Sequence, residues 1–169
     1  PLIFKAMAEH AQEGEFPGVL EKVEKRIGEL TADGKYAPAI LLAGEVIRQL
    51  SSRLSPAQAS SFQKILDDAK ARQLAVDRAR VEQLAAQLQS ADATTGKAAA
   101  AELKAMGDRA VGPLVEALRT IVAGAQPNPA AEKAIVDILV QIAPKLTGYD
   151  PAEAKALRLK RIQEWIKGL

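Results

Sequence analysis

The stretch from Lys97 to Val122, KAAAAELKAMGDRAVGPLVEALRTIV, constrains the fold of this chain more than any other. Its second half carries apolar residues three and four positions apart, the spacing of one face of an α-helix. These residues are Val111, Leu114, Val115, Leu118, Ile121 and Val122. Its first half is rich in Ala, the strongest helix former, and leaves room for a neighbouring helix. We therefore expect two packed helices joined by a connector from Gly107 to Gly112, with Pro113 in the first turn of the second helix.

The same periodicity continues on both sides of this stretch. It predicts helices over 2–12, 19–30, 36–51, 56–90 and 130–143, and a last helix after Asp150-Pro151. Asp33-Gly34 ends one of them, because Gly suits the left-handed turn after a helix. Hydrophobic residues make up 48% of the chain but aromatic residues only 4%, which favours close-packed helices over a β-sandwich. The predicted fold class is all-α.

The longest predicted helix begins at Ser55-Pro56, a helix-start signal, and no Gly or Pro interrupts the chain from there to Ser90. Its apolar stripe changes phase around 70–73, so Leu74 and the residues after it face another direction. Either one long helix presents different faces to its two halves, or two helices meet there; we expect the single helix. The predicted division of the chain is an N-terminal helical region at 1–55, a long connecting helix at 56–91 and a repeat region at 92–169, together one continuous structural unit.

Residues 81–143 resemble HEAT-like repeats, including the short bacterial version named after phycobilisome lyases. The resemblance lies in Leu84, Leu88, Asp92, Ala99–Ala101, Leu103, Gly107, Ala110-Val111, Pro113-Leu114 and Leu118. A shift of 36 residues places Leu103 on Leu139, which suggests a second, degenerate unit. The ending from Leu146 to Trp165 is similar to a terminal cap of bacterial HEAT-like modules. Over 81–169 the resemblance implies an α-solenoid of stacked antiparallel helix pairs with a protein-binding surface.

A second, shorter resemblance lies in the N-terminal region. Gly34-Lys35-Tyr36, followed by Ala39-Ile40, looks like the turn between the two helices of a tetratricopeptide repeat. Pro38 departs from that pattern. The alternative for residues 19–51 is a helical hairpin of any other kind.

The chain offers little material for catalysis or metal binding. It has no Cys, which excludes disulfides, zinc–thiolate sites and thiol catalysis, and its one His is His10, expected to be a surface side chain. The acidic pairs Asp67-Asp68 and Asp77 with Glu82 are expected on solvated helix faces rather than in a cleft. We therefore predict no catalytic residue, no metal site and no cofactor. A hydrolase or lyase using carboxylates in a concave groove is the enzyme alternative.

The charge balance gives no strong attraction to nucleic acid or to anionic membranes, because 23 Lys and Arg face 21 Asp and Glu. The long helix carries five cations that could contact phosphates: Lys64, Lys70, Arg72, Arg78 and Arg80. Acidic residues interleave with them, as is typical of a solvated face. Nucleic-acid binding is therefore the less favoured alternative. No apolar run reaches the length of a membrane span.

The candidate partner-binding residues lie on the last predicted helix. Arg158 and Arg161 precede Trp165 by seven and four positions, so the three share one side of that helix. Trp165 lies at the edge of the apolar stripe, where its ring could be partly exposed against the guanidinium groups. Trp and Arg are enriched at binding hot spots. The competing interpretation is a buried Trp that closes the final repeat, with the Arg side chains covering it.

The sequence thus predicts a non-enzymatic helical-repeat scaffold that binds another protein, as a subunit or fragment of a larger assembly. The partner and the oligomeric state are not readable from the residues. The compartment stays open between the cytoplasm and export, since a chain that starts at Pro1 is compatible with a removed signal.

Overall fold

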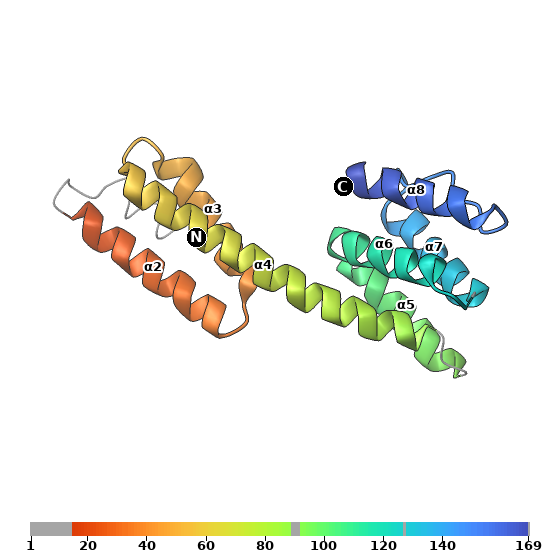
Figure 1. Cartoon of the computed structure of the whole chain (residues 1–169). Helices are drawn as coiled ribbons and strands as arrows, with labels where there is room; N and C mark the ends of the chain where they lie inside the picture. Colours follow the sequence, from red (N-terminus) through yellow and green to blue (C-terminus); the bar gives the residue numbers. More distant parts are fainter. Residues whose placement is uncertain (1–14, 89–91, 127, 169) are drawn as a thin grey trace. The chain divides into compact units, whose positions relative to one another are not determined.

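The computed structural model describes residues 15–88, 92–126 and 128–168. Within these ranges it contains seven α-helices and no strands, which confirms the all-α prediction (Figure 1). The helices are α2 (Phe16–Ala32), α3 (Tyr36–Leu50), α4 (Pro56–Gln87), α5 (Ala93–Met106), α6 (Asp108–Ala123), α7 (Pro129–Ile142) and α8 (Lys155–Gly168). The helix predicted at 2–12 lies outside the described residues.

The first compact unit contains α2, α3 and the first half of α4. Helices α2 and α3 form a hairpin around Gly34, whose φ of 71° confirms the predicted left-handed turn. Helix α2 begins three residues before the predicted start at residue 19, because Phe16-Pro17 belongs to its first turn. Proline lacks only an amide that is unpaired at a helix start, so it is tolerated there. The buried core is Phe16, Val19, Leu20, Val23, Ile27, Leu30, Ala39, Leu42, Ala43, Val46, Leu50, Phe62, Leu66 and Ala69.

Helix α4 is one continuous helix from Pro56 to Gln87, as predicted. Ser55 begins it with a capping box: its hydroxyl accepts from the Gln58 amide, and the Gln58 side chain accepts from the Ser55 amide. The division between the two compact units falls inside the helix, between Leu74 and Ala75. The long helix is therefore shared by the units rather than forming the separate part expected at 56–91.

The phase change explains where α4 divides. Its first half buries Phe62, Leu66 and Ala69 in one core, and its second half buries Val81, Leu84 and Ala85 in another. Leu74 was expected in the second stripe, but its side chain lies between the stripes and is 53% exposed. Each half of the helix thus belongs to the hydrophobic core that covers it.

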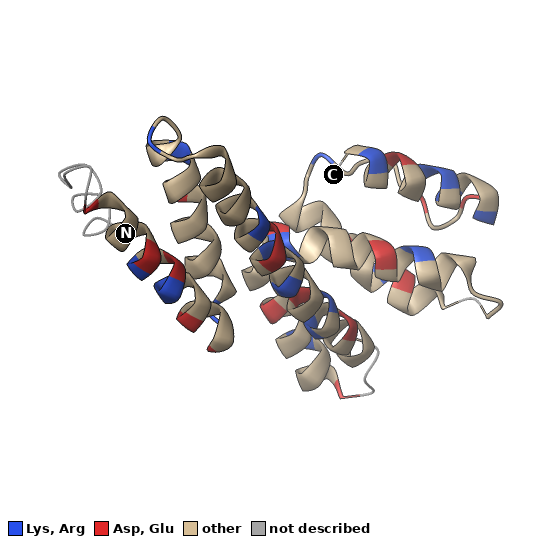
Figure 2. Cartoon of the chain, turned by 60° about the vertical axis from the view of Figure 1, so that its left-hand side comes forward, with Lys and Arg blue, Asp and Glu red and all other residues tan. Residues whose placement is uncertain are grey.

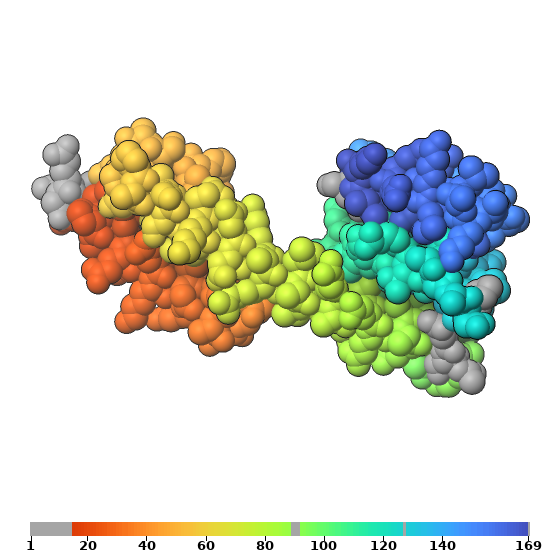
Figure 3. Space-filling model, in the orientation of Figure 1, coloured from red at the N-terminus to blue at the C-terminus, as the bar shows by residue number. Residues whose placement is uncertain are grey.

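The second compact unit contains residues 75–87 of α4 together with α5, α6, α7 and α8. Helix α6 is its centre, since it packs against α5, α7 and α8. Figure 3 shows the side chains of α8, in blue, meeting those of α6, in green to teal. The core that these helices share is Val81, Leu84, Ala85, Ala99, Leu103, Ala110, Val111, Leu114, Val115, Leu118, Val122, Ile135, Val136, Ile138, Leu139, Leu146, Ile162 and Trp165.

The link between α5 and α6 is shorter than predicted. Gly107 alone joins them, with φ 57° and ψ −134°, and α6 already begins at Asp108. Pro113 therefore lies inside α6 and is buried, rather than in its first turn. The ring removes the amide that would bond to the Arg109 carbonyl, but its φ is compatible with a helix. The expected connector at 107–112 is mostly helical for this reason.

Side-chain caps fix the starts of two helices in the second unit. Asp92, in the predicted turn, accepts hydrogen bonds from the amides of Thr94 and Thr95 and starts α5. Asn128 accepts from the Ala131 amide and starts α7. Helix α7 is buried on several sides, as its composition predicted, although Val140 is 47% exposed.

Candidate functional site

Trp165 lies inside the second unit rather than on its surface. The residue is only 6% exposed, and its ring packs against Tyr149 with centroids 5.6 Å apart and planes tilted by 39°. Of the two interpretations, the partly exposed ring does not agree with this burial. The reason is that the segment before α8 brings Tyr149 over the ring, a contact that the helix's own periodicity does not contain. The competing interpretation, a Trp that closes the final helices, agrees with this burial.

Arg158 points inward to Glu132 of α7. Its Nη1 donates to both carboxylate oxygens at 2.5 Å, and only 18% of the Arg side chain and 5% of the Glu side chain are exposed. Tyr149 also donates its hydroxyl hydrogen to Glu132 Oε1. Arg158 Nε is buried and has no hydrogen-bond partner among the described residues. The cluster of Glu132, Tyr149, Arg158 and Trp165, here called the α8 clamp, ties the start of α8 to the start of α7.

The electrostatics of the α8 clamp follow from this geometry. Hydrogen bonding to Glu132 raises the pKa of Arg158, so the guanidinium stays charged. Burial, and then the hydrogen bond to Glu132, raises the pKa of Tyr149 well above its ordinary value of 10.0. The phenol is therefore neutral and serves as a donor. This arrangement holds one buried ion pair in place between α7 and α8.

Arg161 lies outside the clamp. It is 43% exposed and pairs with Glu164 at 2.9 Å. A side chain at Gly148 would meet its guanidinium, since a Cβ built there lies 3.4 Å from Arg161 Cζ. Arg158, Arg161 and Trp165 thus do not form one exposed surface. Arg158 and Trp165 hold α8 within the second unit. That these residues bind a partner stays a prediction.

The two acidic pairs considered in the sequence differ in their burial. Asp67 and Asp68 are exposed, as expected, and Asp68 pairs with Arg72 at 2.9 Å. Asp77 was expected on a solvated face, but its side chain is 7% exposed and lies 3.5 Å from Arg109 of α6. Glu82 is exposed, so these two acids do not act as a pair.

One of the cations on α4, Arg80, is paired with an acidic residue of another helix. Arg80 binds Glu102 of α5 through two of its nitrogens. This hydrogen bonding raises the pKa of Arg80 and lowers the pKa of Glu102. Figure 2 shows Lys and Arg interleaved with Asp and Glu along the helices.

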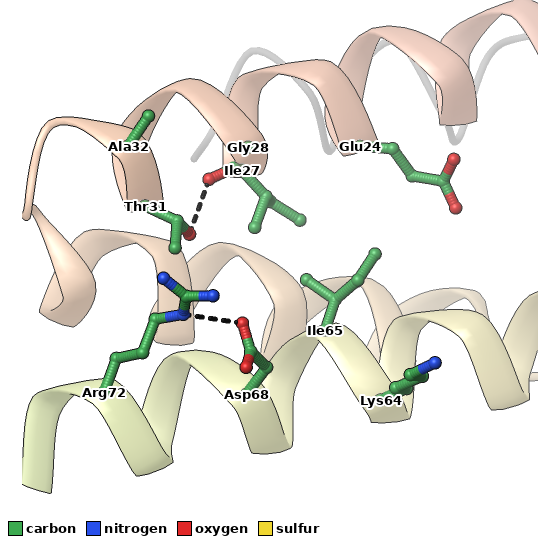
Figure 4. A pocket seen from close by; sticks show the side chains of 9 residues that line it. All are labelled: Glu24, Ile27, Gly28, Thr31, Ala32, Lys64, Ile65, Asp68 and Arg72. Atoms are coloured by element: carbon green, nitrogen blue, oxygen red, sulfur yellow. Dashed lines mark hydrogen bonds and ion pairs between the residues drawn. The ribbon is translucent and has the colours of Figure 1, made fainter.

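The first unit has an open groove of about 440 Å³ between α2 and α4. This α2/α4 groove is lined by Glu24, Ile27, Gly28, Thr31 and Ala32 from α2 and by Lys64, Ile65, Asp68 and Arg72 from α4. Figure 4 shows that Ile27 and Ile65 point toward one another across it. The groove therefore has an apolar floor and charged rims.

Small residues on α2 keep the α2/α4 groove open. Gly28 and Ala32 are four positions apart on the helix, so both lie on the wall of the groove. A Cβ added at Gly28 would meet no atom within 4 Å, apart from its own helix backbone and chain neighbours. Thr31 uses its hydroxyl within α2, where it donates to the Ile27 carbonyl at 2.9 Å. The sequence feature that could have indicated the groove is Gly28, which lies in the interior of α2 and away from its buried apolar stripe.

The second unit has a comparable groove of about 480 Å³ between α4 and α6. This α4/α6 groove is lined by Arg78, Glu82, Ala85 and Ala86 from α4 and by Pro113, Glu116, Ala117, Arg119, Thr120 and Ile121 from α6. Small apolar side chains again lie between charged ones. Neither groove was predicted from the sequence, because each requires the relative placement of two helices distant in the chain.

The described residues are 15–88, 92–126 and 128–168. That part of the chain holds no group of three or more His, Cys, Asp or Glu placed to bind a metal ion. His10 lies outside it. None of the described helices has the length and apolar character that crossing a membrane requires. No family model matches the chain, and comparison with curated proteins and with solved structures found no match.

Proposed function

We propose that this chain is a non-enzymatic helical scaffold that binds another protein, as a subunit or fragment of a larger assembly. The observation that supports this most is an open groove with an apolar floor and charged rims in each compact unit. Apolar floors supply most of the affinity of such sites, and a few polar groups at the rim supply orientation. Both grooves have this composition.

The proposal includes a repeat architecture of stacked antiparallel helix pairs, an α-solenoid of the HEAT-like kind. It is supported by short turns between α2 and α3 and between α5 and α6, and by the central position of α6. Lys155, at the start of α8, donates to the carbonyls of Ala123 and Gly124 at the end of α6, so these two helices run in opposite directions. Solenoids leave long grooves beside their helices and need a closed end. The α8 clamp would close that end.

Carboxylate catalysis in a groove is one alternative to protein binding. In the α2/α4 groove, Asp68 is paired with Arg72, and Glu24 accepts a long hydrogen bond of 3.4 Å from Ser61. A glycosidase-like mechanism would need two carboxylates facing one bond about 5–9 Å apart. Nucleic-acid binding is the other alternative, and it would show affinity that falls steeply as salt rises.

The test is affinity purification from the source cells at near-physiological salt with three baits. The first is the wild-type chain, and the others carry Gly28→Leu in the α2/α4 groove or Ala86→Leu in the α4/α6 groove. Each new side chain fills its groove at an exposed helix position, so the fold should persist. We expect a protein that co-purifies stoichiometrically with the wild type and is lost with one blocked bait. An identical set of proteins with all three baits would contradict the proposal.

A further inference from the structure

We infer that the α2/α4 groove binds a short amphipathic α-helix of a partner protein whose two flanks carry opposite charge. The acidic flank would face α4 and the basic flank would face α2. This inference rests on the proposed function and adds the chemistry of the partner.

The length of the groove fits about two turns of helix. Figure 4 shows Glu24 and Lys64 at one end and Ala32 and Arg72 at the other, so the two walls run in the same direction. Lys64 and Arg72 are eight positions apart, which corresponds to about 12 Å along α4. A docked helix would place two or three apolar side chains along this length, at spacings of three and four residues.

The walls favour a helix over an extended segment. Both walls are helices, whose interior amides and carbonyls are already bonded within the helix. An extended segment would find no backbone partners in such a groove, whereas a helix satisfies its own backbone groups. Gly28 has no side chain, so a large apolar residue of the partner can approach the backbone of α2 between Ile27 and Ile65.

The charges of the two walls differ in sign. The α4 wall carries Lys64, Arg72 and Asp68, hence two positive charges and one negative, for a net +1. The α2 wall carries Glu24 alone, for a net −1. Lys64 makes no ion pair with any described residue and is exposed. A helix with one acidic and one basic flank complements both walls, whereas a helix with two like flanks is repelled by one of them.

The experiment uses the full chain and three labelled synthetic peptides of about 16 residues, long enough to form helix when docked. All three carry Leu at positions three and four apart; their flanks are Glu and Lys, Glu on both sides, or Lys on both sides. Fluorescence anisotropy at low salt measures binding. We expect the mixed peptide to bind about threefold more tightly than either other peptide, as exposed charge pairs allow.

Two variants test the site and its charges. Gly28→Leu should weaken binding of every peptide by about tenfold or more, because the new side chain occupies the groove. Gly18→Leu is the matched control on the same helix, at an open position outside the groove. Lys64→Glu makes both walls negative and should shift the preference to the peptide with two Lys flanks. Lys70→Glu, an exposed position on α4 outside the groove, should leave the preference unchanged.

Four results would overturn the inference, and the first three are no binding of any peptide, binding that Gly28→Leu leaves intact, and a preference that Lys64→Glu does not shift. Self-association of the chain that Gly28→Leu abolishes would identify a second copy as the occupant and would also overturn it. The proposed function is judged separately by the blocked baits. If peptides fail while a protein is still lost from the Gly28→Leu bait, the inference is wrong and the scaffold function stands.

Discussion

Buried charge in the second unit depends on particular partners. Glu132 is 4% exposed as a residue, and its carboxylate accepts from Arg158 and Tyr149. Removing a carboxylate from water costs several kcal/mol, which an ion pair with additional hydrogen bonds offsets. The ion pair does not by itself add much stability. Either charge, however, would be costly to keep buried if the other were removed. The pair therefore ties Arg158 of α8 to Glu132 of α7.

The first prediction concerns this dependence. Arg158→Leu should lower the free energy of unfolding by about 3 kcal/mol, because it leaves Glu132 buried without its cation. Replacing both Arg158 and Glu132 with Leu should recover most of that loss, since no charge then remains buried. Urea unfolding followed by circular dichroism measures both. The control is Arg161→Leu, which breaks the exposed pair with Glu164 and should cost below about 1 kcal/mol. Equal losses for Arg158→Leu and Arg161→Leu would contradict a buried clamp.

A second prediction concerns Gly28 itself. Gly28→Ala should raise the free energy of unfolding by about 0.5–1 kcal/mol, because Ala favours the helix interior and its Cβ has open space. Thermal unfolding measures the change. Gly34→Ala is the contrasting variant: its φ of 71° is left-handed, so the same substitution should destabilise the chain by about 1 kcal/mol. Destabilisation by Gly28→Ala would mean that the position is not open.

At the scale of helices, the periodicity of the sequence predicted well which helices exist. It predicted less well the residues at which they begin and end. The single helix α4 follows from the absence of any residue that would stop it, and the cap at Asp92 follows from its side-chain chemistry. The errors are at two helix starts: α2 begins at Phe16 rather than at residue 19 and so includes Pro17, and α6 begins at Asp108, so Pro113 lies inside it. Proline was interpreted as a boundary signal, whereas its φ is also compatible with the early turns of a helix.

The third prediction belongs to the start of α5. Hydrogen bonds from Thr95 and Thr94 hold the pKa of Asp92 below its ordinary value of 3.8. A carboxyl whose pKa is lowered by folding stabilises the fold above the unfolded pKa and loses this contribution as pH falls through the folded pKa. Asp92→Asn keeps a capping oxygen but cannot titrate. The difference in melting temperature between wild type and Asp92→Asn should therefore shrink from about pH 6 to about pH 3. A difference that is constant with pH would contradict this role.

At the scale of the whole molecule, most of the candidate site could not be predicted from the sequence. A helical wheel places Arg158 and Trp165 on one side of α8 but does not say that Tyr149 and Glu132 cover them. The α2/α4 groove depends on contacts between residues about 40 positions apart, which no local pattern encodes. What the sequence did contain was the change of phase in α4, and that change marks the boundary between the two cores.

The two cores lead to the last prediction, about how the chain loses its structure. Phe62 is fully buried in the core of the first unit and Leu118 in that of the second. Helix α4 contributes residues to both units, and its residues Leu74 and Val76, on either side of the division, are exposed. A cavity in one core therefore removes contacts from that core alone. Local opening of one unit should then be possible while the other stays protected.

Phe62→Ala and Leu118→Ala test this and serve as controls for each other. Each should destabilise its own unit by about 3–4 kcal/mol, through lost burial and the cavity left behind. Hydrogen exchange followed by mass spectrometry should show faster exchange in α2 and α3 for Phe62→Ala, with α6 and α7 nearly unchanged. Leu118→Ala should show the reverse pattern. If either variant accelerated exchange equally throughout the described helices, the chain would unfold as one cooperative unit, and α4 would transmit stability between the cores instead of separating them.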